Sequence, residues 1–99
     1  MGTEAGVKLD DGKLLMELIP PEAIKGLAQV LTFGAEKYMR NGWQTVPNGR
    51  HRYTGALMRH LEAWRSGEMI DPETGINHMY HVLCNAAFLG YFDDNNLNP

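Results

Sequence analysis

The chain has 99 residues, a length that predicts a single domain over residues 1–99. Hydrophobic residues make up 43% and charged residues 21%, which is typical of a globular protein and excludes a disordered one. The formal net charge of -3 argues against binding to nucleic-acid polymers or anionic membranes. Cys84 is the only cysteine and no apolar run is long enough to span a membrane, so we expect a reducing, cytoplasmic location.

The first apolar segment is a short run, LLMELI, at residues 14–19, which we expect to pack against the rest of the chain as a strap. Pro20-Pro21-Glu22 favours the start of a helix, because proline suits the first turn and an acid suits the positive end of the helix dipole. Apolar residues then recur at helical spacing and predict a helix over about residues 21–38. Gly26 and Gly34 weaken this helix but permit another helix to approach closely.

The next segment, residues 39–52, contains two Asn-Gly pairs and a proline, which predict a loop. Trp43 lies inside this loop, although tryptophan side chains are usually largely buried. Two interpretations stay open at this point. Trp43 either closes the edge of the core as a lid or forms a wall of a pocket that binds a nucleotide base.

A second helix is predicted over residues 53–67, with His60 in the middle of its apolar face. Arg59 and Glu62 lie on the other face and are spaced to pair with each other. Gly67 is a candidate C-cap for this helix. In the connection that follows, Asp71-Pro72 resembles an N-cap and first position for the third helix.

The third helix, predicted over residues 76–92, has no charged residue but carries His78, His81 and Asn85. At 100° per residue these three side chains fall within about 60° of one another on one face. The remaining faces are apolar, and a helix that is apolar all round is normally buried. We therefore expect an all-α fold, a small bundle of three main helices, assembled as a homo-oligomer (a dimer or a tetramer) to cover the third helix.

Histidines and acids on facing helices are a common way to build a metal site in a bundle. The candidate ligands are His60, Glu68, Asp71, His78 and His81. Imidazole and carboxylate together favour a divalent ion such as Mg²⁺ or Mn²⁺, with Co²⁺ also suited. The alternative is that the histidines are hydrogen-bonded core residues, that Asp71 is only a cap and that Asn85 fixes helix register. Cys84 has apolar neighbours, which make a thiol inert, so covalent catalysis is not expected.

Several segments together resemble the dATP/dGTP diphosphohydrolase N-terminal family, related to the all-α MazG-type pyrophosphohydrolases. They are KLDDGK, LIPPEAI, VLTFGAEKY, NGW, ALMRHLEAW, GEMIDPETG and HMYHVLCNAAFL, and they span about residues 8–89. The resemblance implies an enzyme of phage nucleotide metabolism, acting in the host cytoplasm. Its reaction would be the metal-dependent hydrolysis of purine deoxynucleoside triphosphates, dGTP or dATP, to the monophosphate and pyrophosphate. His78 and His81 stand where the MazG pattern has an acid pair.

For this reaction the resemblance and the chemistry imply specific roles. Glu36, His60 and Asp71 would be catalytic. Cationic side chains would hold phosphate oxygens, and an aromatic ring would stack on the base. The implied substrate-binding residues are Lys8, Lys13, Lys37, Trp43, Arg59 and Asn85, with Tyr38, Asn41 and Arg52 as further candidates.

Two other functions are compatible with the same residues. One is a non-catalytic helical interaction module, in which the third helix is an oligomer interface. The other is a phosphohydrolase of the His-Asp type, which is disfavoured because the chain has no adjacent His-Asp pair.

Overall fold

The computed structural model describes residues 12–99, which form three α-helices joined by loops and short 3-10 turns. The elements in chain order are η1 (Met16–Leu18), α1 (Pro21–Lys37), η2 (Gly42–Thr45), α2 (Gly49–Arg65) and α3 (His78–Asp94). Within the described residues the extended pairing consists of one isolated antiparallel bridge between Ile70 and Asn77. The prediction of an all-α fold with three main helices is confirmed. None of the described helices combines the length and apolar composition needed to cross a membrane.

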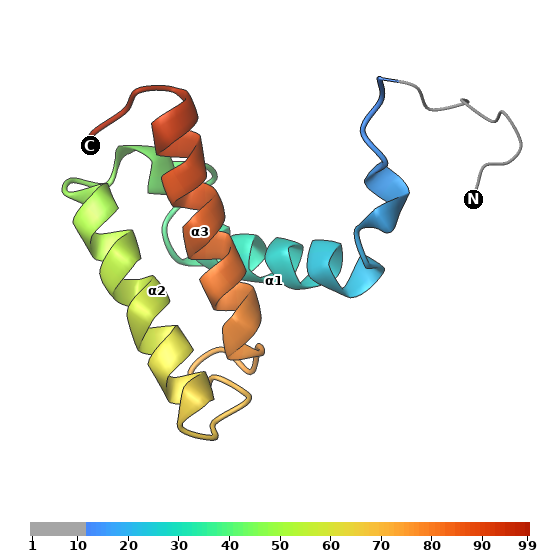
Figure 1. Ribbon diagram of the computed structural model, residues 1–99. Helices are drawn as coiled ribbons and strands as arrows, with labels where there is room; N and C mark the ends of the chain where they lie inside the picture. Colours follow the sequence, from blue (N-terminus) through green and yellow to red (C-terminus); the bar gives the residue numbers. More distant parts are fainter. Residues whose placement is uncertain (1–11) are drawn as a thin grey trace, which may run out of the picture.

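Helices α2 and α3 lie side by side in opposite directions and form a helical hairpin (Figure 1). Helix α1 crosses behind α3 at a steep angle, and its N-terminal end extends away from the hairpin (Figure 1). The crossing is close because Gly26 of α1 is buried against the ring of Tyr80 in α3. A Cβ atom at this position would overlap that ring, so the absence of a side chain permits the contact.

An aromatic cluster closes the end of the hairpin at which α3 finishes. Phe92 is completely buried, and Trp43 of η2 stacks on Phe88 with ring centroids 4.1 Å apart. The Tyr53 hydroxyl donates a hydrogen bond of 2.9 Å to the Trp43 carbonyl, which ties η2 to α2. Trp43 therefore covers the edge of the core, as the first of its two interpretations had it, and the second, a wall of a base-binding pocket, stays a prediction.

The second helix starts earlier than predicted, at Gly49 instead of residue 53. Asn48 precedes it in the left-handed conformation, at φ 58°, so the Asn-Gly pair turns directly into the helix. The Arg50 guanidinium then donates hydrogen bonds to Asp93 and to the Leu97 carbonyl, which anchor the start of α2 to the end of α3. This tertiary anchor explains why residues with turn propensity are helical here.

The third helix begins at His78, two residues later than predicted, and Asn77 caps it by accepting a hydrogen bond from the Met79 N–H. The prediction that Asp71 is the N-cap was therefore wrong. Asp71 lies six residues before Asn77, within the connection from residue 66 to residue 77. Gly67 follows α2 at φ 109° and donates to the Trp64 carbonyl, as expected for a residue that ends a helix.

Much apolar surface is exposed on this chain. Leu14 and Leu18 are 84% and 73% exposed, so the prediction that residues 14–19 pack as a strap is wrong for the single chain. Leu83 and Tyr91 of α3 are also exposed, so the third helix is not covered on all sides as its composition suggested. The helix is buried where it faces α2, α1 and Trp43 of η2, because a three-helix chain has too few neighbours to enclose it.

Candidate metal centre

Three side chains from three separate segments meet between α2 and α3. His60 comes from α2, Asp71 from the connection and His81 from α3, and their ligand atoms lie within 4.8 Å of one another. His81 Nε2 is 3.4 Å from Asp71 Oδ2. Two ligands held about 2.1 Å from one ion have a separation of about 3.0–3.4 Å, so this pair fits a shared cation. The donor set, two imidazoles and a carboxylate, is one that divalent transition metals accept.

Asp71 is held in place by a tight turn in the connection. Its backbone N–H donates to the Ile76 carbonyl and its own carbonyl accepts from the Gly75 N–H, at 2.9 Å and 2.7 Å. Its carboxylate accepts further hydrogen bonds from the Glu73 N–H and the Thr74 hydroxyl. Asp71 is consequently only 8% exposed although it belongs to a loop. A buried carboxylate that is oriented by its own turn would need little rearrangement to bind a cation.

A chain of hydrogen bonds behind His60 decides which of its ring nitrogens is free. The Glu68 carboxylate, which only accepts, lies 2.7 Å from His78 Nε2. In a neutral ring, His78 therefore donates from Nε2 and accepts at Nδ1, where His60 Nδ1 lies 2.8 Å away. His60 donates that bond, so its Nε2 keeps a lone pair. With a neutral His78, the chain Glu68–His78–His60 would leave His60 Nε2 free to bind a cation, in the way that outer hydrogen bonds orient metal-bound histidines.

Glu68 and His78 were predicted as direct ligands, and they lie outside the group formed by His60, Asp71 and His81, so direct coordination by them stays a prediction. Both ring nitrogens of His78 are engaged in hydrogen bonds, and His78 is only 3% exposed. Glu68 contacts the group only through His78. Their arrangement fits an orienting role better than coordination.

The protonation states of the three grouped side chains favour a cation. Burial lowers the pKa of His60, and the neighbouring His81 lowers it further. Burial also lowers the pKa of His81, with Asp71 opposing the effect. The two rings stack at 4.2 Å and nearly parallel, so two imidazolium charges here would repel each other. For Asp71, burial raises the pKa, but hydrogen bonds from Thr74 and the backbone outweigh it and the net pKa is lowered. Neutral imidazoles and an ionised carboxylate are the forms that bind metal.

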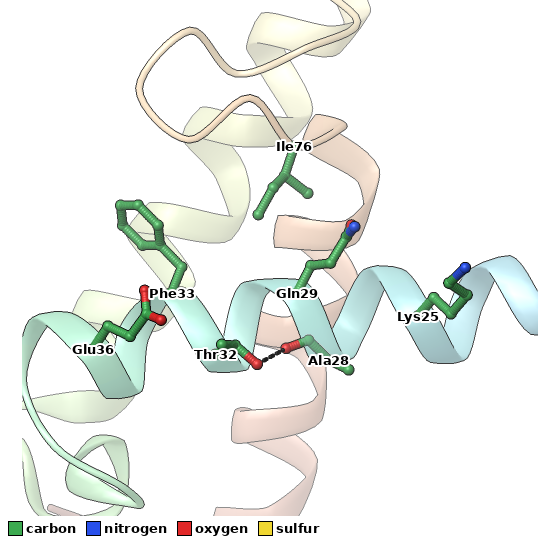
Figure 2. Close-up of a pocket in the computed structure, with 7 residues that line it drawn as sticks. All are labelled: Lys25, Ala28, Gln29, Thr32, Phe33, Glu36 and Ile76. Carbon is green, nitrogen blue, oxygen red and sulfur yellow. Dashed lines mark hydrogen bonds between the residues drawn. The ribbon is translucent and has the colours of Figure 1, made fainter.

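Glu36, predicted as catalytic, does not join this group. It is exposed on α1, where Figure 2 shows it among the residues that line a groove between α1 and Ile76 of the connection before α3. That groove has a volume of about 430 Å³ and is lined by Lys25, Ala28, Gln29, Thr32, Phe33, Glu36 and Ile76. Lys37, the next residue, forms an exposed ion pair with Glu73, 3.8 Å long. A catalytic role for Glu36 therefore stays a prediction.

Among the predicted substrate-binding residues, the structure brings Arg59 and Asn85 together. Both line a second cavity, of about 350 Å³, on the α2–α3 hairpin. Trp43 lines neither cavity, because its ring is packed in the aromatic cluster. Lys13 is exposed near the start of the described residues, and Lys8 lies outside them. The expected pairing of Arg59 with Glu62 is wrong: Glu62 binds the guanidinium of Arg65.

Sequence reasoning missed Thr74, whose hydroxyl donates to Asp71 Oδ2 at 2.9 Å and therefore accepts from His81 Nε2–H, 2.8 Å away. A cation bound between Asp71 and His81 would take the place of that Nε2 proton. The available signal was its position three residues after Asp71, a spacing at which a hydroxyl closes a turn on the carboxylate. The expectation for Cys84 is met, since it is 2% exposed and burial raises the pKa of its thiol to about 12.

Comparison with known proteins addresses the identity of this fold and site. Residues 3–98 match the model of a family described as dATP/dGTP diphosphohydrolase, N-terminal. The chain belongs to this family. A protein of Salmonella phage PMBT28, named dATP/dGTP diphosphohydrolase, is 32% identical to it over 90 residues, which cover 91% of this chain. The chain spans only 30% of the length of that relative. No solved structure matches the chain.

Proposed function

We propose that the chain hydrolyses purine deoxynucleoside triphosphates, dGTP and dATP, to the monophosphate and pyrophosphate in a reaction that depends on a divalent metal. The observation that carries this proposal is the convergence of a half-buried His60 with the buried Asp71 and His81 in one group. Membership of the diphosphohydrolase family and the name of the phage relative support the substrate class.

The residues of the centre divide into ligands and supports. His60, Asp71 and His81 would hold the ion, and Glu68 with His78 would keep His60 in its ligand tautomer. When bound, a divalent ion supplies charge neutralisation for phosphate oxygens and activation of water for attack on phosphorus. Two imidazoles beside one carboxylate favour Mn²⁺ or Co²⁺ over Mg²⁺, because Mg²⁺ prefers oxygen ligands.

The test is to incubate the pure chain with each of the four dNTPs and Mg²⁺, Mn²⁺ or Co²⁺, and to separate the products by ion exchange. We expect pyrophosphate together with dGMP or dAMP, and loss of turnover in His81→Ala. Release of triphosphate or of a single phosphate would refute the assigned bond. Absence of product with every metal would refute the proposed function.

We also propose that the chain assembles as a homo-oligomer, a dimer or a tetramer. Support comes from apolar side chains on all three helices that are exposed in the single chain, among them Ile24 (54%), Met58 (61%) and Leu83 (37%). A second copy would cover them without needing any other partner. Light scattering coupled to gel filtration should give at least twice the 11.1 kDa mass. A monomer at micromolar concentration would refute this assembly.

A further inference from the structure

The second cavity opens one helical turn from the candidate metal centre. Asn85 follows His81 by four residues on α3, and Ala56 precedes His60 by four residues on α2. Residues four apart lie on the same face of a helix, so this cavity continues the seam that holds the metal group. It is lined by His51, Arg52, Tyr53, Ala56, Arg59 and Asn85.

The charge along this cavity is unusual for the start of a helix. The positive end of a helix dipole favours acids in the first turn, yet α2 begins with Arg50, His51 and Arg52 and has no acid there. Arg50 is compensated by its ion pair with Asp93, at 2.7 Å. His51 and Arg52 make no ion pair or side-chain hydrogen bond within residues 12–99. Arg52 therefore contributes uncompensated positive charge at this end of the cavity.

Arg59 adds a second cationic group, beside Arg52, without a carboxylate partner among the described residues. The nearby acid Glu62 is occupied by Arg65. The Arg59 guanidinium folds back over Gly55, where its Nη1 would lie only 3.0 Å from a Cβ atom. The missing side chain at residue 55 thus gives Arg59 room to extend along α2 towards Arg52. Two arginines on one edge of a cavity suit the bidentate recognition of phosphate oxygens.

Asn85 supplies an independent sign that a ligand belongs here. Its side chain is only 7% exposed and lines the cavity. Its Nδ2 donates a hydrogen bond of 2.8 Å to the His81 carbonyl. This bond leaves Oδ1 as a buried acceptor that no donor among the described residues reaches. Buried polar atoms are normally paired, so an acceptor left open towards a cavity indicates a missing donor.

We propose that this cavity is the substrate cradle, in which Arg52 and Arg59 bind the phosphate chain and Asn85 Oδ1 accepts a hydrogen bond from an N–H or O–H group of the nucleoside. The inference deepens the proposed function and rests on it for the nucleotide nature of the ligand. In this arrangement, side chains of α2 alone bind the phosphate chain beside the metal group. The nucleoside then faces Asn85 on α3.

The first experiment separates phosphate binding from catalysis by using inorganic tripolyphosphate in EDTA, with affinity measured by titration calorimetry. Arg52→Ala and Arg59→Ala should each weaken binding at least 10-fold. Arg65→Ala is the matched control, since it removes the same charge from the same helix outside the cavity, and it should change affinity less than 2-fold. Circular dichroism should show that each of the three arginine variants remains folded.

The second experiment uses dGTP in the same metal-free buffer and tests Asn85. Asn85→Ala should weaken dGTP binding about 10-fold and leave tripolyphosphate binding unchanged, because tripolyphosphate has no nucleoside. Equal losses for both ligands would overturn the assignment of Asn85.

The outcomes for the cradle and for the proposed function are distinguishable. If wild type fails to bind tripolyphosphate, or if the Arg52 and Arg59 variants match Arg65→Ala, the cradle is refuted even when turnover occurs. If tripolyphosphate binding depends on Arg52 and Arg59 but no metal supports turnover, the cradle is supported and the proposed function is refuted.

Discussion

The hydrogen-bond chain behind His60 predicts that an acid outside the metal group controls metal affinity. Glu68 accepts from His78 at 2.7 Å, and His78 in turn accepts from His60 at 2.8 Å. In Glu68→Gln the amide can donate to His78 Nε2, which permits the opposite tautomer. His78 would then donate to His60 Nδ1, and His60 would carry its proton on Nε2, where the ligand lone pair is needed.

The expected magnitude follows from the outer-shell position of Glu68. Loss of such a hydrogen-bond partner typically costs about 10- to 100-fold in metal affinity, which corresponds to about 1.4–2.7 kcal/mol. The assay is calorimetric titration of the apo chain with Co²⁺ or Mn²⁺ at neutral pH. His60→Ala, which removes a ligand, should lose more affinity than Glu68→Gln.

Two variants distinguish the effect of the hydrogen bond on metal affinity from the effect of the negative charge alone. Glu62→Gln removes an acid that is also exposed but pairs only with Arg65, and it should bind metal like the wild type. Glu68→Asp keeps the charge but shortens the reach to His78, so it should lose affinity as Glu68→Gln does. If both Glu68 variants bind like Glu62→Gln while His60→Ala does not, the hydrogen-bond chain has no part in metal binding and the reasoning fails.

Three further expectations concern stability, pH and thiol reactivity. Gly26→Ala should destabilise the chain by about 1–3 kcal/mol, because the added methyl group overpacks the contact with Tyr80. Gly34→Ala, at a position with open space around it, should stabilise the chain by about 0.4–1 kcal/mol. Thermal melts that rank the two variants in the opposite order would contradict the α1–α3 contact. Because burial lowers the pKa of His60 and His81 below the unfolded value of 6.5, the unfolded apo chain takes up more protons. Its melting temperature in EDTA should therefore fall as pH drops below about 6.5, and a flat profile from pH 7 to 5 would count against buried neutral rings. Cys84, with a thiol pKa near 12, should resist a thiol reagent at pH 8 until the chain is unfolded, and rapid labelling of the native chain would exclude its burial.

The helices and their polar stripe were predictable because helical periodicity is a local property of the sequence. The first helix was placed within one residue of α1, and the side chains of His78, His81 and Asn85 are all buried on the face predicted for them. The all-α class follows from the same 3.6-residue pattern. For Trp43 in the loop, the sequence allowed two roles, but it did not decide between them.

The arrangement of the centre was decided by tertiary structure. Asp71 reads as a helix cap, yet a turn closed by Thr74 carries it to His81. Glu68 and His78 have the chemistry of ligands, but their mutual hydrogen bond places them behind His60. Loop conformation and ring tautomers depend on contacts between distant segments, which periodicity does not encode.

The same distinction applies to the cavity beside the centre. The sequence supplied its cations, but Glu62 has arginines three residues away on both sides. Only the fold shows that Glu62 pairs with Arg65 and leaves Arg59 without a carboxylate partner within residues 12–99. Similarly, the composition of residues 14–19 and of α3 demands burial, but a single chain does not provide it. Sequence therefore determined which side chains this protein has to pair or cover, and the tertiary structure decided their partners, because each partner comes from a different segment.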